Sequence, residues 1–263
     1  MDEYTQMLAE GKYDEMQRVR MKNIPLKLHK FFPLFDSQLS VENEKRFKTL
    51  SSNSTWCSMP CCQNDPYEFN GFYIDHKTLV ENGWPDSIID KIEKGLDRSF
   101  GYYLCSLTAN DENSLPMWAY YTNSYKGYCI EYCVISPARI HPVRYESQRV
   151  DATLIVAELI LAHERGDEKM AKKILHIIYE YFYIKHASWR HENEYRIISA
   201  VDNLEIRGKN ISNDMLGIKP VRLITGYCCS EENKARLAQI CKKMDIQFCQ
   251  ATLSDNSYYF EVK

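Results

Sequence analysis

The order in which apolar residues change their spacing along the chain constrains its fold more than any other feature. Segments with apolar residues at every second position predict strands, and segments with apolar residues three and four positions apart predict helices. The two kinds of segment are mixed here without the regular strand–helix–strand rhythm of a parallel sheet. We therefore predict an α+β fold, in which helices flank a mixed, mostly antiparallel sheet.

The predicted elements cover most of the chain. We expect strands at residues 24–35, 102–107, 128–134, 194–201, 221–228, 246–253 and 258–262. We expect helices within residues 81–100, at residues 117–121, 147–163, 168–183 and 231–244, and after the candidate cap Ser40 as far as Leu50. No internal repeat or linker is present, so we expect a helical lead-in over residues 1–24 and a single domain over residues 25–263.

Charge and hydropathy argue against several classes of protein. The 33 basic and 36 acidic side chains give a formal net charge of −3, so no overall positive field indicates nucleic-acid binding. The sequence has no run of about 18 apolar residues, the length that a membrane helix needs. It also begins without the basic-then-apolar order of a secretory signal. We therefore expect a cytoplasmic protein that does not contact a membrane.

The ten cysteines do not form a complete metal-binding pattern. Cys57 and the pair Cys61-Cys62 resemble part of a zinc knuckle, but the second Cys-x-x-Cys pair of a tetrahedral zinc site is missing. A reducing cytoplasm keeps most thiols free. We therefore expect no bound metal.

Aromatic residues are frequent, and tyrosine is the commonest of them. The chain has 19 Tyr, 10 Phe and 4 Trp, which together make 13% of its residues. Because a buried tyrosine hydroxyl needs a hydrogen-bond partner, this composition favours a polar cleft lined by aromatic rings.

Charged residues alternate along the segment Glu192 to Ile198. If one strand covers this segment, Glu192, Glu194 and Arg196 lie on the same face. Carboxylates about 7 Å apart repel each other unless a cation, a hydrogen-bond donor or a ligand lies between them. The pattern indicates either a lattice of salt bridges with Lys126 or Lys185, or a catalytic site in which Arg196 orients a reactive glutamate.

Two further clusters place polar residues beside aromatic ones. Asn64 and Asp65 precede a proline, so this segment forms either a simple turn or one wall of a cleft that Asp65 or Glu68 faces. Trp118 and Tyr121 share a face of a predicted helix, where they fill the core or form a stacking platform for a planar ring. Lys126 follows this helix and would lie near an anionic group in the second case.

Taken in order, these clusters resemble a bacterial and phage-associated family catalogued as a domain of unknown function, number twenty-nine seventy-one. The resemblance extends from about residue 26 to the end of the chain. Its motifs are Leu28-His-Lys-Phe-Phe, Asn64-Asp-Pro-Tyr-Glu, Cys105-Ser-Leu-Thr, Met117-Trp-x-x-Tyr, Lys126-Gly-x-Cys-Ile, Trp189-x-x-Glu-x-Glu-Tyr-Arg and Leu223-Ile-Thr-Gly. The family has no settled activity, so the resemblance implies a fold more than a function.

The sequence departs from the family pattern at three places. Gln63 stands where the family usually has Phe, and Tyr125 stands where it often has His. Phe32-Pro33 replaces the basic residue that usually follows the first aromatic pair. If these positions bind substrate, we expect altered specificity or reduced activity.

One functional hypothesis is an enzyme that cleaves the nicotinamide–ribose bond of NAD. The predicted cleft resembles that of ADP-ribosyltransferase-type toxins, which place a His or Arg on an early strand, aromatic residues beside the ring and a Glu on a later strand. Glu194 or Glu192 would stabilise the oxocarbenium-like transition state, and Arg196 would orient that carboxylate. The remaining site residues would hold NAD, which is then substrate rather than resident cofactor: Trp118 and Tyr121 at the nicotinamide, His29 and Lys30 at the adenosine side, with Asn64, Asp65 and Lys126 along the cleft.

The alternative hypothesis is a binding module of a bacterial defence or toxin-type system. Such a module captures a nucleotide, a nucleic-acid end or a peptide in the aromatic cleft and breaks no bond. The net charge near zero weakens the nucleic-acid version, because neutralising phosphates requires a concentrated basic face. The sequence leaves open the oligomeric state and whether a protein or a nucleic acid is the acceptor.

Overall fold

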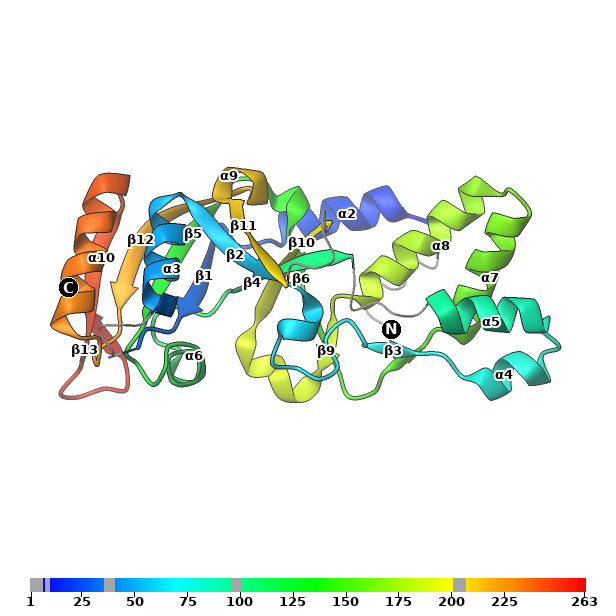
Figure 1. Cartoon of the computed structure of the whole chain (residues 1–263), viewed down its shortest axis with the longest axis horizontal. Coiled ribbons are helices and arrows are strands. Elements are labelled where there is room, and N and C mark those ends of the chain that lie inside the picture. The colour runs from blue at the N-terminus through cyan, green and yellow to red at the C-terminus, as the bar shows by residue number, and fades with distance from the viewer. Residues whose placement is uncertain (1–6, 8–9, 36–40, 96–100, 201–206) are drawn as a thin grey trace.

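The computed structural model describes residues 7, 10–35, 41–95, 101–200 and 207–263. Figure 1 shows an elongated molecule in which strands gather at one end and four helices, α4, α5, α7 and α8, form the other. The predicted α+β class and the mostly antiparallel sheet are both confirmed. Ser40 and the first residues of the predicted lead-in lie outside the described residues.

The main sheet has ten strands within the described part of the chain. They run in the order β11-β2-β4-β1-β5-β12-β13-β14, and β10 pairs with both β4 and β6. The pairs are antiparallel except for β12 with β13. The strands are β1 (Lys27–Phe32), β2 (Ser54–Ser58), β4 (Tyr102–Thr108), β5 (Tyr128–Val134), β6 (His141–Pro142), β10 (Glu194–Ala200), β11 (Gly208–Ser212), β12 (Ile218–Thr225), β13 (Gln247–Leu253) and β14 (Phe260–Val262).

Helices cover both faces of this sheet and build the far end of the molecule. The α-helices are α2 (Tyr13–Lys22), α3 (Val41–Ser51), α4 (His76–Glu81), α5 (Asp86–Gly95), α6 (Leu115–Tyr121), α7 (Thr153–Glu164), α8 (Glu168–Tyr181), α9 (Asn213–Leu216) and α10 (Glu231–Met244). The described residues also form three short 3₁₀ helices, η1 (Pro60–Cys62), η2 (Pro137–Arg139) and η3 (Ala187–Glu192). Two small parallel pairs join β3 (Phe72–Tyr73) to β8 (Val150–Asp151) and β7 (Arg144–Glu146) to β9 (Ile184–His186).

The helix predicted at residues 147–163 begins later than expected, at Thr153. The reason is long-range pairing: Val150 and Asp151 pair with β3, so only the residues that follow them can form the helix. The Asp151 carboxylate then accepts hydrogen bonds from the backbone N–H of Thr153, at 2.9 Å, and from its hydroxyl. By contrast, the helix predicted at residues 231–244 is confirmed, and its cap Ser230 accepts from the Asn233 N–H.

In the part of the chain that the structure describes, three groups of buried apolar side chains hold the layers together. The largest lies between one face of the sheet and the helices α3 and α10, with Leu28, Phe47 and Leu237 among its members. On the opposite face, α6 packs its Trp118 against the strands. A third group fills the helical end, where α5, α7 and the segment after α8 meet. The candidate site lies where the helical end joins the sheet.

The N-terminal helix α2 packs on the domain. Met16 is buried, and the Arg20 guanidinium donates to the backbone carbonyls of Ala138 and Ile140 around η2. Tyr13 stacks on His176 of α8, with ring centroids 4.1 Å apart. The division of the chain at residue 24 stays a prediction.

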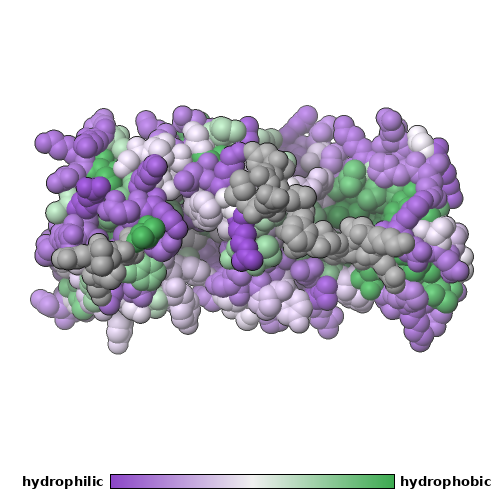
Figure 2. Space-filling view, viewed as in Figure 1, coloured by the Kyte–Doolittle hydropathy of each residue, from purple (hydrophilic) through white to green (hydrophobic). Residues whose placement is uncertain are grey.

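The helical end exposes apolar surface. Figure 2 shows hydrophobic residues gathered there, and an apolar groove of about 420 Å³ lies along α5 and α7. Within the residues that the structure describes, none of the helices has the length and apolar character needed to span a bilayer.

A tight left-handed turn links α6 to β5 and brings the chain back onto the sheet. Asn123, Ser124 and Tyr125 all have positive φ, between 53° and 67°. Gly127 follows, and a Cβ there would lie 1.9 Å from the carbonyl oxygen of Phe32. Only glycine therefore allows β5 to approach the end of β1 this closely.

We expect Gly127→Ala to lower the free energy of unfolding by more than about 3 kcal/mol, because the backbone of β1 has to move. Gly83→Ala is the control for crowding, because an added Cβ there has nothing within 4 Å, and the only cost comes from the positive φ of Gly83, 69°. Gly83→Ala should lower the free energy of unfolding by about 1 kcal/mol. Urea denaturation followed by circular dichroism measures both, and equal losses would show that the close approach is not the constraint.

Candidate functional site

The segment that carries Glu192, Glu194 and Arg196 is only partly a strand. Glu192 ends the 3₁₀ helix η3, Asn193 is left-handed with φ 45° and ψ 54°, and β10 begins at Glu194. The strand predicted to begin at Glu194 is confirmed. The condition that one strand carries all three residues does not hold for Glu192, because the left-handed residue breaks the period of two. Both glutamate side chains nevertheless line the same cavity.

Arg196 is fully buried and joins three segments of the chain. Its guanidinium donates to the two carboxylate oxygens of Glu194 at 2.9 and 3.1 Å. It also lies 2.7 Å from the Glu68 carboxylate and donates to the Phe182 carbonyl at 2.7 Å. Burial favours the neutral form of Glu194, but Arg196 and Lys185 outweigh it and hold the pKa of Glu194 at about 2.

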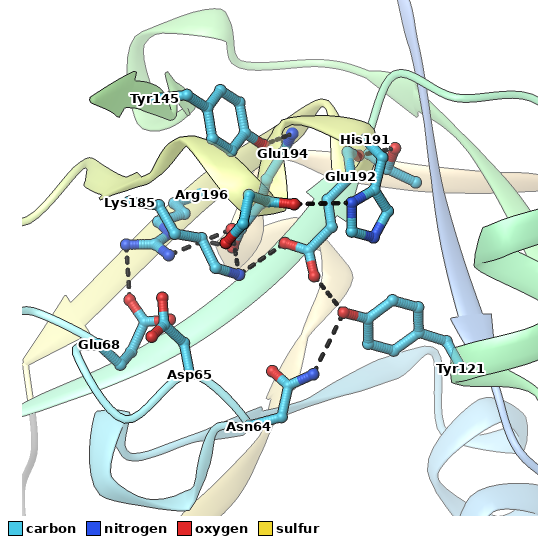
Figure 3. Close-up of polar contacts among 12 residues, drawn as sticks. Asn64, Asp65, Glu68, Tyr121, Tyr145, Lys185, His191, Glu192, Glu194 and Arg196 are labelled. Atoms are coloured by element: carbon cyan, nitrogen blue, oxygen red, sulfur yellow. Dashed lines mark hydrogen bonds and ion pairs between the residues drawn. The ribbon is translucent and has the colours of Figure 1, made fainter. Parts of the chain in front are cut away.

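Lys185 on β9 is the cation that lies between the two glutamates (Figure 3). Its Nζ is 2.6 Å from Glu192 Oε2 and 3.3 Å from Glu194 Oε2. The ammonium also lies 4.7 Å from the centre of the Trp189 ring. Burial opposes its charge, but the surrounding carboxylates outweigh that effect and raise the pKa of Lys185.

Tyr121 and Asn64 complete the contacts of Glu192. The Tyr121 hydroxyl donates to Glu192 Oε1, and the Asn64 amide donates to the same hydroxyl at 3.2 Å. Burial and the Glu192 carboxylate both raise the pKa of Tyr121. Figure 3 shows Tyr121 and Lys185 reaching Glu192 from different elements.

Asp65 and Glu68 bring two more acidic side chains into this region. Asp65 Oδ1 accepts from the Tyr67 N–H at 2.9 Å, which is the simple turn considered from the sequence. Its other oxygen, Oδ2, is buried without a hydrogen-bond partner among the described residues. Burial raises the pKa of Glu68 to about 7, although Arg196 opposes this shift.

Two cavities flank this network, and Lys185 lines both. The small cavity has a volume of about 120 Å³ and is lined by Glu192, Glu194, Tyr121, Asn64, His29 and Lys30, among others. The large cavity has a volume of about 440 Å³, and Asp65, Tyr67 and Trp189 are part of its wall. The consecutive residues Asn64 and Asp65 thus face different cavities.

His29 and Lys30 lie where the sequence hypothesis needs them, on the wall of the small cavity. Neither ring nitrogen of His29 has a hydrogen-bond partner among the described residues, and Nε2 is 3.6 Å from Glu131 Oε2. Burial lowers the pKa of His29. The Lys30 ammonium donates to the Ser106 carbonyl at 2.7 Å.

Trp118 and Lys126 are not brought to this cavity. Trp118 has no exposed surface, its indole N–H donates to the Glu112 carbonyl at 2.8 Å, and its ring packs edge-on against Phe31. The structure thus places Trp118 in the core, with no free face for a ligand ring. Lys126 is not among the residues that line either cavity.

A second polar cluster lies behind His29. One atom that could ligate a metal on each of His29, Glu112 and Glu131 lies within 4.8 Å of the others, a grouping that could hold a metal ion. However, Arg222 Nη2 is 3.0 Å from Glu112 and 2.6 Å from Glu131. A divalent cation there would lie beside a guanidinium, so the geometry fits an ion pair better than a metal centre.

The site hypothesis drawn from the sequence gives no catalytic or NAD-binding role to Lys185 or Glu68. Lys185 was one of two candidate partners in the salt-bridge interpretation, and it is the one that contacts the glutamates. The sequence does indicate that two neighbouring carboxylates need a cation between them. The sequence does not show whether that cation is Lys185 or Lys126, because the answer depends on how β9 and η3 pack against each other.

A protein family matches part of the chain. Residues 117–197 match the family described as "Protein of unknown function (DUF2971)", which confirms the family resemblance over that segment. The matched segment includes Tyr121, Lys185, Glu192, Glu194 and Arg196. No curated protein and no solved structure matches the chain.

We expect Lys185→Met to lower the free energy of unfolding by about 3–5 kcal/mol, because it leaves two buried carboxylates without their shared cation. Adding Glu192→Gln to the same chain should recover part of that loss. Lys172→Met, on the exposed side of α8, is the control and should change stability by less than about 0.5 kcal/mol. Urea denaturation measures all three, and a Lys185→Met protein as stable as the control would show that the bridge contributes nothing.

The raised pKa of Glu68 predicts a pH-dependent stability. Between pH 4.5, the ordinary pKa of this carboxyl group, and about pH 7, the folded protein keeps a proton on Glu68 that the unfolded chain has lost. Stability from this group is therefore present at low pH and falls by up to about 1.4 kcal/mol per pH unit as pH rises through that window.

Glu68→Gln removes this titration. The melting temperature of the variant relative to wild type should therefore increase steadily from pH 5 to pH 7.5, measured by scanning fluorimetry. Glu81→Gln, where the side chain is 63% exposed, should show a constant difference. A flat profile for both variants would mean that Glu68 does not titrate in this range.

Proposed function

We propose that the small cavity and its neighbour bind NAD and cleave its nicotinamide–ribose bond, as in an ADP-ribosyltransferase-like or NAD-cleaving enzyme. The observation that carries this proposal is the position of Glu192. Its carboxylate lines a cavity and is held between Tyr121 and Lys185, beside a second carboxylate that is already fully paired.

The pairing of the two glutamates favours Glu192 over Glu194 as the reactive carboxylate. Both oxygens of Glu194 accept hydrogen bonds from the buried Arg196, so this carboxylate has little freedom to meet a substrate. Glu192 contacts one hydroxyl and one ammonium, and a ribose hydroxyl can take the place of the Tyr121 hydroxyl. In this proposal Glu194 and Arg196 position Lys185, and Lys185 positions Glu192.

The chemistry needs a carboxylate where positive charge develops. As the C1′–N bond breaks, its electron pair leaves with the nicotinamide, and the ribose becomes oxocarbenium-like. A carboxylate that accepts a hydrogen bond from a ribose hydroxyl binds this state more tightly than the ground state. Water, or a nucleophile on an acceptor, then bonds to C1′ and gives up a proton.

The sizes of the two cavities suit a substrate that places a different part in each. About 120 Å³ is the volume that about four water molecules share in the liquid, enough for a sugar-sized group but not for a dinucleotide. The adjoining 440 Å³ cavity falls in the usual range for ligand pockets. His29 and Lys30 offer further polar groups on the wall of the small cavity.

The proposal also covers the cellular role and location of the protein. The family resemblance is to bacterial and phage-associated proteins, and consumption of a central nucleotide suits a toxin or phage-defence system. We propose a cytoplasmic location and an acceptor that is a protein, a nucleic acid or water.

The alternative is a module that binds a nucleotide, nucleic acid or peptide without breaking a bond. One observation favours it: each carboxylate oxygen of Glu192 and Glu194 already has a donor within the protein. A ligand that leaves these contacts in place would be held at the cavity wall and would not react.

Glu192→Gln separates the two functions. We expect it to lower the rate of nicotinamide release from labelled NAD by about 10²- to 10³-fold, while the Kd for NAD changes little, because the carboxylate acts mainly in the transition state. Glu168→Gln, at an exposed position on α8, should retain the wild-type rate. An unchanged rate in Glu192→Gln contradicts the assignment. NAD binding without any release by the wild-type protein supports the binding module.

A further inference from the structure

Two adjacent thiols at the surface have no part in the proposed reaction. Cys61 and Cys62 end the 3₁₀ helix η1, and both side chains are exposed to solvent. Their sulfur atoms lie 3.9 Å apart. Neither residue lines the small or the large cavity, so the pair is a separate chemical feature of the chain.

The distance between the two sulfurs fits a metal chelate. Zinc binds thiolates at about 2.3 Å in tetrahedral geometry, which places two of its sulfur ligands about 3.8 Å apart. Cys61 Sγ and Cys62 Sγ are already at nearly this separation. An ion bound by one sulfur therefore reaches the other without a large movement, and the second bond forms within the chain at a high effective concentration.

The turn that carries the thiols is held by its own contacts. The Cys62 N–H donates to the Met59 carbonyl at 3.0 Å, and the Met59 side chain is buried. The side-chain amide of Gln63 donates to the Ser58 hydroxyl at 2.7 Å. Because the backbone is fixed before an ion arrives, little conformational entropy is lost on binding.

Cys57 does not join this pair. The sequence pattern groups it with Cys61 and Cys62, but its side chain is 1% exposed and belongs to the core under α3 and α10. Among the described residues, no third His, Cys, Asp or Glu side chain has a ligand atom close to both exposed sulfurs. The protein therefore offers two thiolates, and water fills the remaining positions of a bound ion.

The chain has a second pair of adjacent cysteines, and its structure is different. Cys228 is exposed, but Cys229 is only 4% exposed and belongs to the same apolar core as Cys57. An ion in solvent can reach only one of these two sulfurs. Adjacency in the sequence is therefore not sufficient, and burial distinguishes the two pairs.

We propose that Cys61 and Cys62 form a surface binding site for a soft divalent metal ion of the zinc type. Such ions prefer thiolate sulfur, whereas Mg²⁺ prefers oxygen ligands. Each thiol gives up its proton and each sulfur donates an electron pair to the ion, so binding of one ion releases two protons. Desolvation and the Cys61 thiol raise the pKa of Cys62, so binding strengthens as the pH rises. This site lies outside the proposed NAD reaction and does not depend on it.

Cadmium titration of the reduced chain tests the site, because Cd²⁺ shares the thiolate preference of zinc and its bonds to sulfur absorb in the ultraviolet. We expect one Cd²⁺ to bind per chain. Zn²⁺ should displace it, and Mg²⁺ at the same concentration should leave it in place. A wild-type protein without a sulfur–cadmium band overturns the proposal, and so does a band that Mg²⁺ removes as readily as Zn²⁺.

Cys61→Ser and Cys62→Ser are the matched variants, because both positions are exposed and serine is similar in size to cysteine. We expect each to weaken Cd²⁺ binding at least tenfold, since a single thiolate cannot chelate the ion. Cys228→Ser, at the exposed position of the other pair, is the control and should change binding less than twofold. Circular dichroism confirms that the variants are folded. Wild-type affinity in a folded Cys61→Ser or Cys62→Ser protein, or an equal loss in Cys228→Ser, overturns the proposal.

Discussion

The ion pairs of the buried Arg196 guanidinium are the interaction on which the rest of the site depends. Arg196 and Glu194 pair within β10, the ion pair with Glu68 ties this strand to the loop after η1, and a hydrogen bond to the Phe182 carbonyl ties it to the end of α8. Removing one member of such a buried group leaves an uncompensated charge, so these segments are held in one arrangement. Lys185 extends the network to Glu192 and, through it, to Tyr121 on α6.

This network occupies the junction between the sheet and the helical end of the molecule (Figure 1). Apolar packing stabilises each side separately, since one buried group lies under α3 and α10 and another lies within α5 and α7. The polar groups between them are therefore fixed by two cores at once. Such fixed dipoles and charges favour a developing charge without having to reorganise, and this is the physical basis of the proposed chemistry.

Some of the site could be predicted from single segments, and some could not. Glu194 and Arg196 are two residues apart on a real strand, so the period of two correctly places their side chains together. Glu192 reaches the same cavity by a different route, through a 3₁₀ helix and the left-handed Asn193. Trp118 and Tyr121 share a helix face in the sequence, yet only Tyr121 lines a cavity.

The sequence by itself determined the α+β class, the positions of most strands and helices, and the acidic segment at the centre of the site, because these follow from local periodicity and capping. Only the tertiary structure decided which lysine lies between the glutamates and that Trp118 fills the core instead of forming a stacking platform. It also placed neighbouring residues of one turn in two different cavities. The physical reason is that these contacts join residues on separate strands and loops, whose pairing depends on the packing of the whole chain.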